Sequence, residues 1–490
     1  MKVKTQRFKF APLLILISGL CASCTVSDYF NSDTNVDRKE SINVEQANQQ
    51  IAEAKAAEQK RIELEKQQQA ELKLTELMKN QPVQFNSTLA KIYAMREFAP
   101  IWQDEDAKKK FLHEYAALVA SGISRNMATS LDAISSTPVE NIQHDILLTD
   151  AFLGYMYYTN NVSSSAQSWL YSQNNYKADK PSDELIVNWL TAVENNENLA
   201  FVNKLSSSNK LYQETLQRIS SDLATDKKQS SAELYKLALN AQRLRIIPSF
   251  ENGLFVNIPS YQLNYYRDGK LVLNSRVIVG KEARKTPVMY SKLSNVVVNP
   301  PWNVPNTILV KDIVPKLARD PSYAERSSLE IFDSRGNKIN AHSVNWSQYV
   351  NSKSVPFRIR QKAGDDSALG RFKFNMPSSD AIYLHDTPNH SLFNKTSRAL
   401  SSGCVRVAKS DDLASILLKE AGWSMDKKQT VLASKKTTSV QIQSNNPVYL
   451  YYVTTWVENG KVQTLPDIYG YDRLNAAPSY INWNTIRKYL

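Results

Sequence analysis

The chain has 490 residues, which is too long for one compact core, so two or more domains are expected. Hydrophobic residues make up 42% of it and Tyr contributes 24 residues, which argues against a disordered chain and favours globular, partly β-rich domains. The formal net charge of +12 suits an anionic partner.

The N-terminus has the pattern of an export signal. Basic residues precede a short apolar stretch over residues 10–20, which ends in Cys21-Ala22-Ser23-Cys24. This stretch spans a bilayer poorly, so a signal peptide over residues 1–24 is predicted. Its end resembles a bacterial lipoprotein box, with Cys21 where Leu is usual. We expect lipidation at Cys24, with plain cleavage or an uncleaved anchor as the alternatives.

In each of these cases the chain leaves the cytoplasm. Nucleic acid is therefore not expected as a partner, whereas the bacterial wall and membrane surface are anionic. Removal of Cys21 and lipidation of Cys24 would leave Cys404 as the one free thiol. An unpaired Cys in an oxidising compartment is a liability unless its reactivity is used. A buried structural Cys is the competing interpretation.

Residues 25–82 are predicted to form a polar helical spacer. From Arg38 to Asn80 the chain has neither Gly nor Pro and is rich in Glu, Gln, Lys and Ala, and Pro82 follows. Its apolar positions are too sparse for a firm heptad. A spacer that holds the rest of the chain off a membrane is therefore preferred to a coiled-coil partner.

Residues 83–245 are predicted to form an all-α scaffold domain. Apolar residues recur every three or four positions, and Ser, Asn and Pro clusters such as 135–138 separate the helices. Two carboxylates, Asp145 and Asp150, make the stretch 145–155 a candidate site. A buried amphipathic helix with capping Asp residues is the preferred interpretation.

Residues 246–475 are predicted to form an antiparallel, β-rich domain, followed by a tail over 476–490. Hairpins are expected around Asp268-Gly269 and Asn459-Gly460. Further strands are expected at 254–258, 296–298, 329–332 and 381–384. The strand pattern stops between about 305 and 355, where an insertion with a helical piece is expected to act as a lid or substrate wall. The predicted fold class is α+β and multidomain.

The candidate site lies in two short segments of this domain. His385 ends an apolar strand, and Gly403 allows a left-handed backbone that lets main-chain N–H groups converge beside Cys404. In an extended segment Arg406 shares a face with Cys404, where it favours the thiolate and can hold a substrate carboxylate. A Cys nucleophile with a His general base suffices for acyl transfer. A backbone carbonyl, rather than the side chain of Asp386, is expected to orient His385.

These segments resemble the signature of the YkuD-type L,D-transpeptidases, in which a His precedes Ser/Thr-His-Gly-Cys, a hydrophobic residue and Asn or Arg. Here residues 386–400 separate His385 from Ser401-Ser402-Gly403-Cys404-Val405-Arg406. The departure is Ser402, where most of the family carries His, although the large periplasmic YcbB-like subgroup tolerates Ser. The resemblance extends from about Phe98 to Asp472.

The resemblance implies a β-sandwich-like catalytic domain with a lid, and a cysteine acyltransferase that acts on peptidoglycan. Cys404 would attack the diaminopimelate carbonyl of a tetrapeptide stem, release D-alanine and pass the acyl group to the side-chain amine of a second stem, which gives a 3-3 crosslink. The resemblance also implies the periplasm of a Gram-negative bacterium and acylation by carbapenem inhibitors. Anchorage to a membrane by an N-terminal lipid is expected from the lipoprotein box at Cys24.

The resemblance further assigns roles to single residues. Catalysis would fall to Cys404 and His385, with Gly403 and Cys404 forming the oxyanion hole. The residues that would bind or surround the substrate are Arg406, Tyr383, Ser401, Ser402 and Trp302. His390 is expected at the surface. The remaining histidines lack ligand spacing, so neither a metal nor another cofactor is expected.

Two alternatives stay open. With water or an outer-membrane lipoprotein as acceptor, the same site would give an L,D-carboxypeptidase or an enzyme that attaches or detaches lipoproteins. The second alternative is a non-catalytic, wall-binding lipoprotein. The joint presence of His385, Gly403, Cys404 and Arg406 argues against it, because a binding module has no need of all four.

Overall fold

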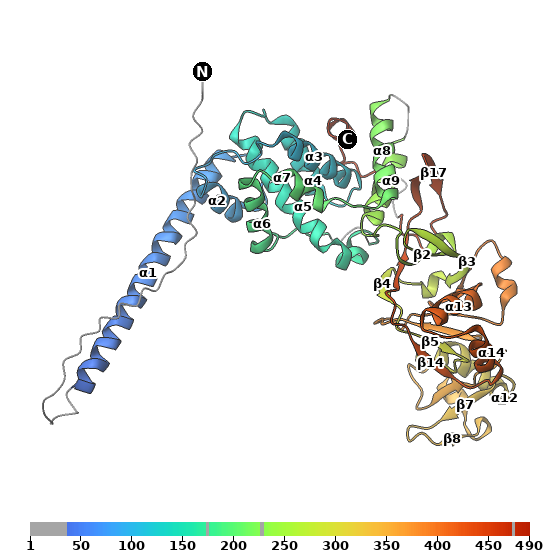
Figure 1. The fold of residues 1–490 in the computed structure, drawn as a ribbon. Coiled ribbons are helices and arrows are strands. Elements are labelled where there is room, and N and C mark those ends of the chain that lie inside the picture. The colour runs from blue at the N-terminus through green and yellow to red at the C-terminus, as the bar shows by residue number, and fades with distance from the viewer. Residues whose placement is uncertain (1–36, 173–175, 226–229, 473–475) are drawn as a thin grey trace. The chain divides into compact units, whose positions relative to one another are not determined.

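The computed structural model describes residues 37–172, 176–225, 230–472 and 476–490, so the predicted signal peptide and Cys24 lie outside the described residues. Residues 1–68 and 69–490 form two separate units. Helix α1 (Asp37–Leu77) confirms the predicted long helix (Figure 1), and its side chains are exposed at every position from 48 to 66. Its last turns belong to the second unit, where Ala70, Leu74 and Met78 are buried at four-residue spacing. None of the described helices is long and apolar enough to cross a bilayer.

The predicted all-α scaffold is confirmed, and side chains at the helix starts account for several of its boundaries. Asp104, Ser124, Ser182, Asn209 and Ser230 each accept hydrogen bonds from free N–H groups of the first turn. The helices are α2 (Asn86–Ala94), α3 (Glu105–Ala120), α4 (Arg125–Ser136), α5 (Ile142–Trp169), α6 (Asp183–Glu194), α7 (Asn198–Leu205), α8 (Lys210–Ala224) and α9 (Ser231–Arg245).

The two carboxylates of α5 are structural. Asp145 accepts from the N–H groups of Ile101 and Trp102, and Asp150 accepts from those of Gln84 and Phe85. They therefore hold the loops before α2 and α3 and do not cap their own helix. Burial raises the pKa of Asp150 to about 6, against the opposing effect of its backbone hydrogen bonds. The stretch 145–155 belongs to the scaffold core, as preferred from the sequence.

A buried ion pair joins three scaffold helices. The carboxylate of Glu114 on α3 accepts from Arg245 of α9 at 2.9 Å and from the Tyr212 hydroxyl of α8 at 2.6 Å. Lys110 adds a second cation at 2.9 Å. Burial raises the pKa of Glu114, but Arg245, Lys110 and Tyr212 outweigh it and lower the pKa to about 2.

Glu114→Gln should destabilise the protein at pH 7 by about 3 kcal/mol, because it leaves Arg245 buried without its counter-ion. The pKa of Glu114 in the folded protein lies below its ordinary value of 4.5. The ionised carboxylate therefore stabilises the fold fully above pH 4.5, and this stabilisation is lost as the pH falls to about 2. Thermal unfolding of both forms across this window measures the effect. Equal acid sensitivity of the wild type and the variant would contradict it.

The catalytic sheet is long, mixed and curled. Its strand order is β14-β5-β10-β11-β13-β3-β2-β1-β15-β4, with β12 also paired to β3. The strands are β1 (Gly253–Asn257), β2 (Gln262–Arg267), β3 (Lys270–Gly280), β4 (Met289–Lys292), β5 (Asn295–Val298), β10 (Phe372–Asn375), β11 (Leu384–His385), β12 (Ala399–Ser401), β13 (Val405–Val407), β14 (Thr438–Gln441) and β15 (Pro447–Tyr451). Strand β3 pairs with β2 through its first part and with β13 and β12 through its last, so it belongs to both halves of the sheet.

Both predicted hairpins are confirmed: β2 with β3, and β16 (Thr455–Glu458) with β17 (Lys461–Thr464). The prediction of a purely antiparallel domain is wrong, because β1 with β15, β11 with β13 and β12 with β3 are parallel pairs. The strand expected at 381–384 begins only at Leu384. Ala381 has φ +52, a left-handed conformation that an extended strand cannot accommodate.

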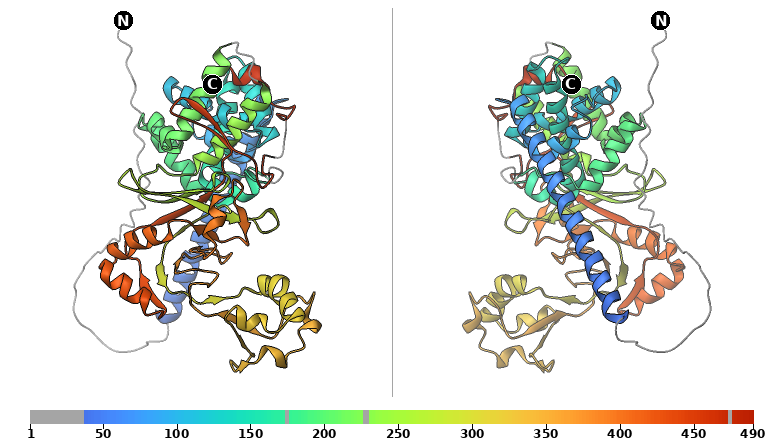
Figure 2. Two further views of the ribbon diagram at one scale, coloured as in Figure 1. Left: turned by 90° about the vertical axis from the view of Figure 1, so that its right-hand side faces the viewer. Right: turned by 90° about the vertical axis from the view of Figure 1, so that its left-hand side faces the viewer.

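The insertion between β6 and β9 forms a lobe of its own (Figure 2). A separate sheet, in the order β6-β9-β7-β8, packs on short helices around a small core that contains Leu317, Trp346 and Ile359. The predicted bounds of 305–355 miss the two strands that tie the lobe to the domain. Its elements are β6 (Trp302–Asn303), α10 (Asn306–Ile308), η3 (Leu309–Ile313), α11 (Val314–Arg319), α12 (Tyr323–Arg326), β7 (Leu329–Phe332), β8 (Lys338–Ile339) and β9 (Arg358–Gln361).

The remaining helices cover the catalytic sheet or return to the scaffold. They are α13 (Ser410–Glu420), α14 (Met425–Ala433) and α15 (Trp483–Ile486). Helix α13 packs on β5 and β10 through buried residues that include Leu413 and Leu417. Helix α15 lies in the predicted tail and packs on α3 and α4.

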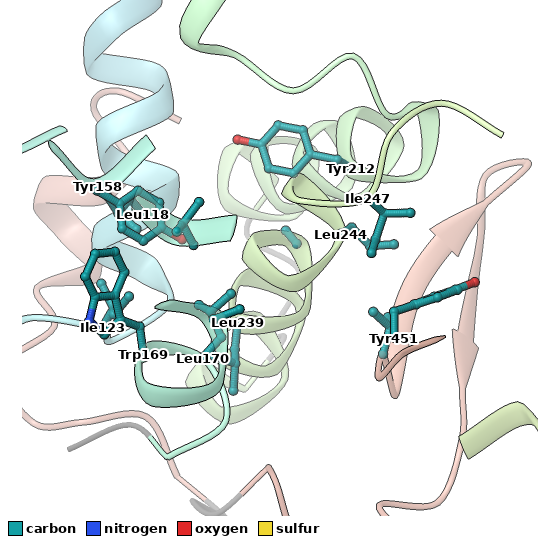
Figure 3. Packing of buried hydrophobic residues seen from close by; sticks show 14 of the residues in the cluster. Leu118, Ile123, Tyr158, Trp169, Leu170, Tyr212, Leu239, Leu244, Ile247 and Tyr451 are labelled. Carbon is teal, nitrogen blue, oxygen red and sulfur yellow. The ribbon is translucent and has the colours of Figure 1, made fainter. Parts of the chain in front are cut away.

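The scaffold and the catalytic domain share one continuous core (Figure 3). Arg243 of α9 is fully buried at this junction, and it donates to Asp472 at 2.6 Å and to the carbonyls of Tyr471 and Leu170 at 2.9 and 3.1 Å. Its guanidinium lies 4.8 Å from the ring centre of Tyr171. The C-terminal segment is therefore fixed to the scaffold beside the catalytic sheet.

Candidate functional site

Three cationic or titratable side chains lie in one cross-strand row. Lys373 on β10 is paired in register with His385 on β11, which in turn is paired with Arg406 on β13. In the neighbouring row Phe374, Leu384 and Val405 are in register and fully buried. Because successive side chains point to opposite faces of a sheet, one face enters the core and the other carries the polar row.

This polar face opens into a cavity of about 350 Å³, here called the cysteine pocket. The insertion supplies one wall through residues that include Ile308, Asp312 and Tyr323. The pocket gathers nearly all the site residues predicted from the sequence: Trp302, Tyr383, His385, Ser401, Ser402, Cys404 and Arg406. Gly403 lies in the loop behind the sulfur.

The loop that carries Cys404 is held by two hydroxyl groups. Gly403 has φ +120, which side chains rarely adopt, so glycine is required there. The Ser401 hydroxyl accepts from the Gly403 N–H at 3.1 Å and donates to the Cys404 carbonyl at 2.6 Å. The buried Thr286 hydroxyl accepts from the Gly280 N–H at 2.8 Å and donates to the Gly403 carbonyl at 2.7 Å.

The two expected oxyanion donors differ in what they contact. The N–H of Gly403 is already bound to Ser401, whereas the N–H of Cys404 donates to no acceptor within the described residues. The Cys404 N–H is therefore the one that a developing oxyanion can use.

His385 is buried and its tautomer is fixed. Its Nδ1 lies 2.5 Å from the carbonyl oxygen of Asp386, the kind of acceptor expected from the sequence. A carbonyl only accepts, so Nδ1 carries the proton and Nε2 is left to take one. Burial lowers the pKa of His385 to about 3, and Arg406 and Lys373 lower it further against the Asp386 hydrogen bond, so the ring is neutral at pH 7.

The carboxylate of Asp386 serves the framework. It accepts from the Arg371 N–H at 2.9 Å and from the Ser410 hydroxyl at the start of α13 at 2.7 Å. A Cβ at Gly370 would come within 2.4 Å of its Oδ2, so glycine is needed there. His390 is exposed, with its Nε2 3.8 Å from Asp386.

Burial raises the pKa of the Cys404 thiol, and this effect exceeds the opposing effects of hydrogen bonds from Tyr383 and of the positive charges of Lys373 and Arg406. The sulfur also lies 3.9 Å from the Ala381 carbonyl. Cys404 and His385 therefore rest as a neutral thiol and a neutral imidazole in one pocket, not as a thiolate–imidazolium ion pair.

The lining of the cysteine pocket carries two cations, Lys316 and Arg406, and two carboxylates, Asp312 and Asp380. Neither Arg406 nor Lys373 forms a salt bridge within the described residues, and the buried Nε of Arg406 has no hydrogen-bond partner there. Burial lowers the pKa of both groups. A half-buried guanidinium without a counter-ion favours an anionic ligand, and a carboxylate fits it best.

Arg284 joins the nucleophile loop to the insertion. Its Nη1 donates to the Ser402 hydroxyl at 2.9 Å and to Asp312 of η3 at 2.5 Å. The helix that carries Asp312 contains a π-helical turn over Leu309–Ile313 and continues as α11, with Pro315 in the first turn of α11, where its missing N–H removes one ladder hydrogen bond. Ser402 therefore links the loop to the lid.

Comparison with known proteins identifies the family. A model of the L,D-transpeptidase catalytic domain, YkuD, matches residues 251–442, and a model of the scaffold domain matches residues 87–218. A Haemophilus influenzae protein named "Putative L,D-transpeptidase" is 56% identical over 410 residues, which cover 83% of this chain and 82% of that protein. This chain belongs to the YkuD-type L,D-transpeptidase family. The resemblance inferred from the sequence is confirmed, including the combination with a scaffold domain.

The sequence analysis missed several residues around this L,D-transpeptidase site. Lys373 sits in the alternation Phe372-Lys373-Phe374, which signals a strand with one polar face but gives no hint of its partner strand. Thr286 and Arg284 have no signal of their own in the sequence, because their contacts depend on tertiary structure. No group of three or more His, Cys, Asp or Glu side chains suited to a metal occurs among the described residues.

Alkylation of Cys404 by iodoacetamide should be slow at pH 7, and its rate should rise only above pH 9, the ordinary pKa of a thiol. Burial raises the pKa of Cys404 and so keeps the thiol protonated. Lys373→Met should move the midpoint of the curve of alkylation rate against pH to a still higher pH, since it removes a cation that favours the thiolate. Lys292→Met, on the exposed end of β4, is the control. Mass spectrometry of the labelled protein gives the rate, and a plateau below pH 7 would show an ion pair instead.

Thr286→Val should cost about 1–3 kcal/mol of stability, because the buried Gly280 N–H and Gly403 carbonyl lose their shared partner. The looser loop should also slow acylation of Cys404. Thr286→Ser keeps the hydroxyl and should retain most of both properties. Thermal unfolding and acylation rates test this, and equal losses in the two variants would refute the role of the hydroxyl.

Proposed function

We propose that this protein is a peptidoglycan L,D-transpeptidase that forms 3-3 crosslinks through a thioester on Cys404. The observation that carries the proposal is the meeting, in one pocket, of a thiol, an imidazole whose Nε2 has no hydrogen-bond partner and a half-buried guanidinium that forms no salt bridge, both within the described residues. Membership of the family supports transpeptidation. Arg406, which forms no salt bridge within the described residues, supports a donor that carries a carboxylate, as a peptide stem does.

Acylation starts from the neutral pair. As Cys404 Sγ attacks the donor carbonyl, its proton passes to His385 Nε2, so the thiolate develops only when substrate is in place. The Cys404 N–H faces the oxyanion. The imidazolium, disfavoured by burial and by two cations, readily gives its proton to the leaving amine. The C–N bond breaks, D-alanine departs and the thioester remains.

Transfer reverses these roles. The side-chain amine of a second stem attacks the thioester, His385 takes its surplus proton and returns it to the departing sulfur, and a new amide forms. Arg406 is assigned to a donor carboxylate, and Tyr383 and Trp302 to the pocket wall beside the acyl chain. Ser401 shapes the loop, and Ser402 positions it through Arg284. Carbapenems are expected to acylate the same sulfur.

Other acceptors would use the same first step. Water would make the protein an L,D-carboxypeptidase, and an outer-membrane lipoprotein would make it an attachment enzyme. The wall that the insertion supplies, with Ile308 and Tyr323, favours exclusion of water and hence an amine acceptor. A purely wall-binding protein would have no use for the free Nε2 of His385.

We further propose export through residues 1–24 and lipidation at Cys24, with α1 as a spacer from the membrane. These proposals stand on the N-terminal sequence and on the exposed, polar surface of α1. They place the enzyme in the periplasm of a Gram-negative bacterium, where its substrate lies.

Purified protein incubated with disaccharide-tetrapeptide stems should yield 3-3 dimers and free D-alanine, detected by mass spectrometry. Cys404→Ala should abolish both products. His385→Gln should slow acylation by about 10²–10⁴-fold, the usual contribution of a general base. Tripeptide without dimers would reassign the protein as a carboxypeptidase, and no product that depends on Cys404 would refute an enzymatic role.

A further inference from the structure

A second cavity, of about 340 Å³, lies where the scaffold meets the catalytic domain. This junction cleft shares no lining residue with the cysteine pocket. Its walls come from α8 and α9 on one side and from the β16–β17 hairpin on the other, and its floor from β1, β2, β3 and β15. Helices α8 and α9 both pack against β16, which fixes the walls relative to one another (Figure 1).

The floor is a ladder of amide side chains. Gln262, Asn264 and Tyr266 alternate along one face of β2, and Asn274 of β3 is in register with Asn264. The Nδ2 of Asn274 donates to Asn264 Oδ1 at 2.7 Å and to Gln262 Oε1 at 3.5 Å. Within the described residues this leaves the NH₂ groups of Gln262 and Asn264 and the carbonyl oxygen of Asn274 for a ligand.

Aromatic rings and two carboxylates, Glu214 and Glu458, complete the lining. Trp456 and Tyr266 are half-buried, and Tyr451 is buried at the floor. Glu214 of α8 approaches Lys210 at 3.5 Å through one oxygen, whereas its other oxygen is buried and without a hydrogen-bond partner among the described residues. That oxygen favours a ligand that donates hydrogen bonds.

These groups together select a class of ligand. Amide donors and acceptors with a carboxylate acceptor suit hydroxyl and N-acetyl groups, and flat rings suit the C–H faces of a sugar. An anionic ligand is disfavoured because Lys210, the one cation of the lining, lies beside Glu214. A purely apolar ligand would leave the amide ladder desolvated. The volume is at the lower end of the roughly 300–1,000 Å³ of small-ligand sites, enough for a few sugar rings in an open groove.

We propose that the junction cleft binds the glycan strand of peptidoglycan, separately from the peptide stems that enter the cysteine pocket. The choice of this glycan rests on the proposed function, whereas the preference for a neutral saccharide rests on the cleft itself. Contact with the glycan holds the enzyme on its polymeric substrate between turnovers, which raises the local concentration of stems.

The test uses the mature chain carrying Cys404→Ala, which cannot turn over, and chitotetraose, an N-acetylglucosamine oligomer without peptide. Isothermal titration calorimetry should detect binding. Trp456→Ala should weaken the Kd about tenfold or more through loss of the stacked ring, and Trp456→Phe should restore most of the affinity. Trp423→Ala, an equally half-buried ring between α13 and α14, is the matched control and should bind as before.

A second variant tests the amide ladder without touching the core. Asn264→Ala with Asn274→Ala should weaken the Kd to a similar extent and leave thermal unfolding unchanged, since both side chains lie at the surface of the cleft. In chains with Cys404 intact, Trp456→Ala should crosslink glycan-free tetrapeptides at the wild-type rate.

No binding of chitotetraose, or binding that none of these variants weakens, would overturn the proposal. Because the binding assay involves no turnover, its result is independent of whether Cys404 forms crosslinks.

Discussion

The alternation of side chains across β10, β11 and β13 is the constraint on which the active site depends. One face of these strands lies in the hydrophobic core, with α13 packed on β10, so every second residue must be apolar, as Phe374, Leu384 and Val405 are. Register then leaves Lys373, His385 and Arg406 in one row on the opposite face. The same packing that stabilises the sheet therefore places two cations beside an imidazole. Burial, together with these two charges, lowers the pKa of His385 and keeps the ring neutral, as the first proton transfer requires. The same charges attract the carboxylates of a peptide stem.

A continuous path of buried contacts runs from the scaffold to the nucleophile loop. Arg243 fixes the C-terminal segment through Tyr471 and Asp472. Within that segment the Tyr469 hydroxyl donates to the Gly280 carbonyl at 2.6 Å and accepts from the Thr286 N–H at 3.1 Å. Thr286 in turn holds Gly403. The scaffold is thus part of the support of the active site, which explains why one unit contains both domains, and it also supplies a wall of the junction cleft.

Much of the fold and of the candidate site could be predicted from short sequence patterns. The Gly- and Pro-free stretch before Pro82 predicted α1, and the Asp-Gly and Asn-Gly pairs predicted two hairpins. The site was predicted from the resemblance of the segments around His385 and Cys404 to the family signature. Features that depend on distant partners were not predictable. Parallel pairing of β11 with β13 joins segments that no turn connects, and the left-handed Ala381 shortens a strand whose sequence favours extension. The roles of Lys373, Thr286 and Arg284 arise only from tertiary contacts, and so does the cleft that contains Trp456.

The central claim is that Cys404 carries the acyl group, and intact-protein mass spectrometry tests it most directly. Protein mixed with a tetrapeptide stem and quenched in acid should gain the mass of the stem minus that of D-alanine. Peptide mapping should place the adduct on Cys404, and hydroxylamine should remove it, as expected of a thioester. No adduct on a protein that still forms crosslinks, or an adduct on another residue, would contradict the account.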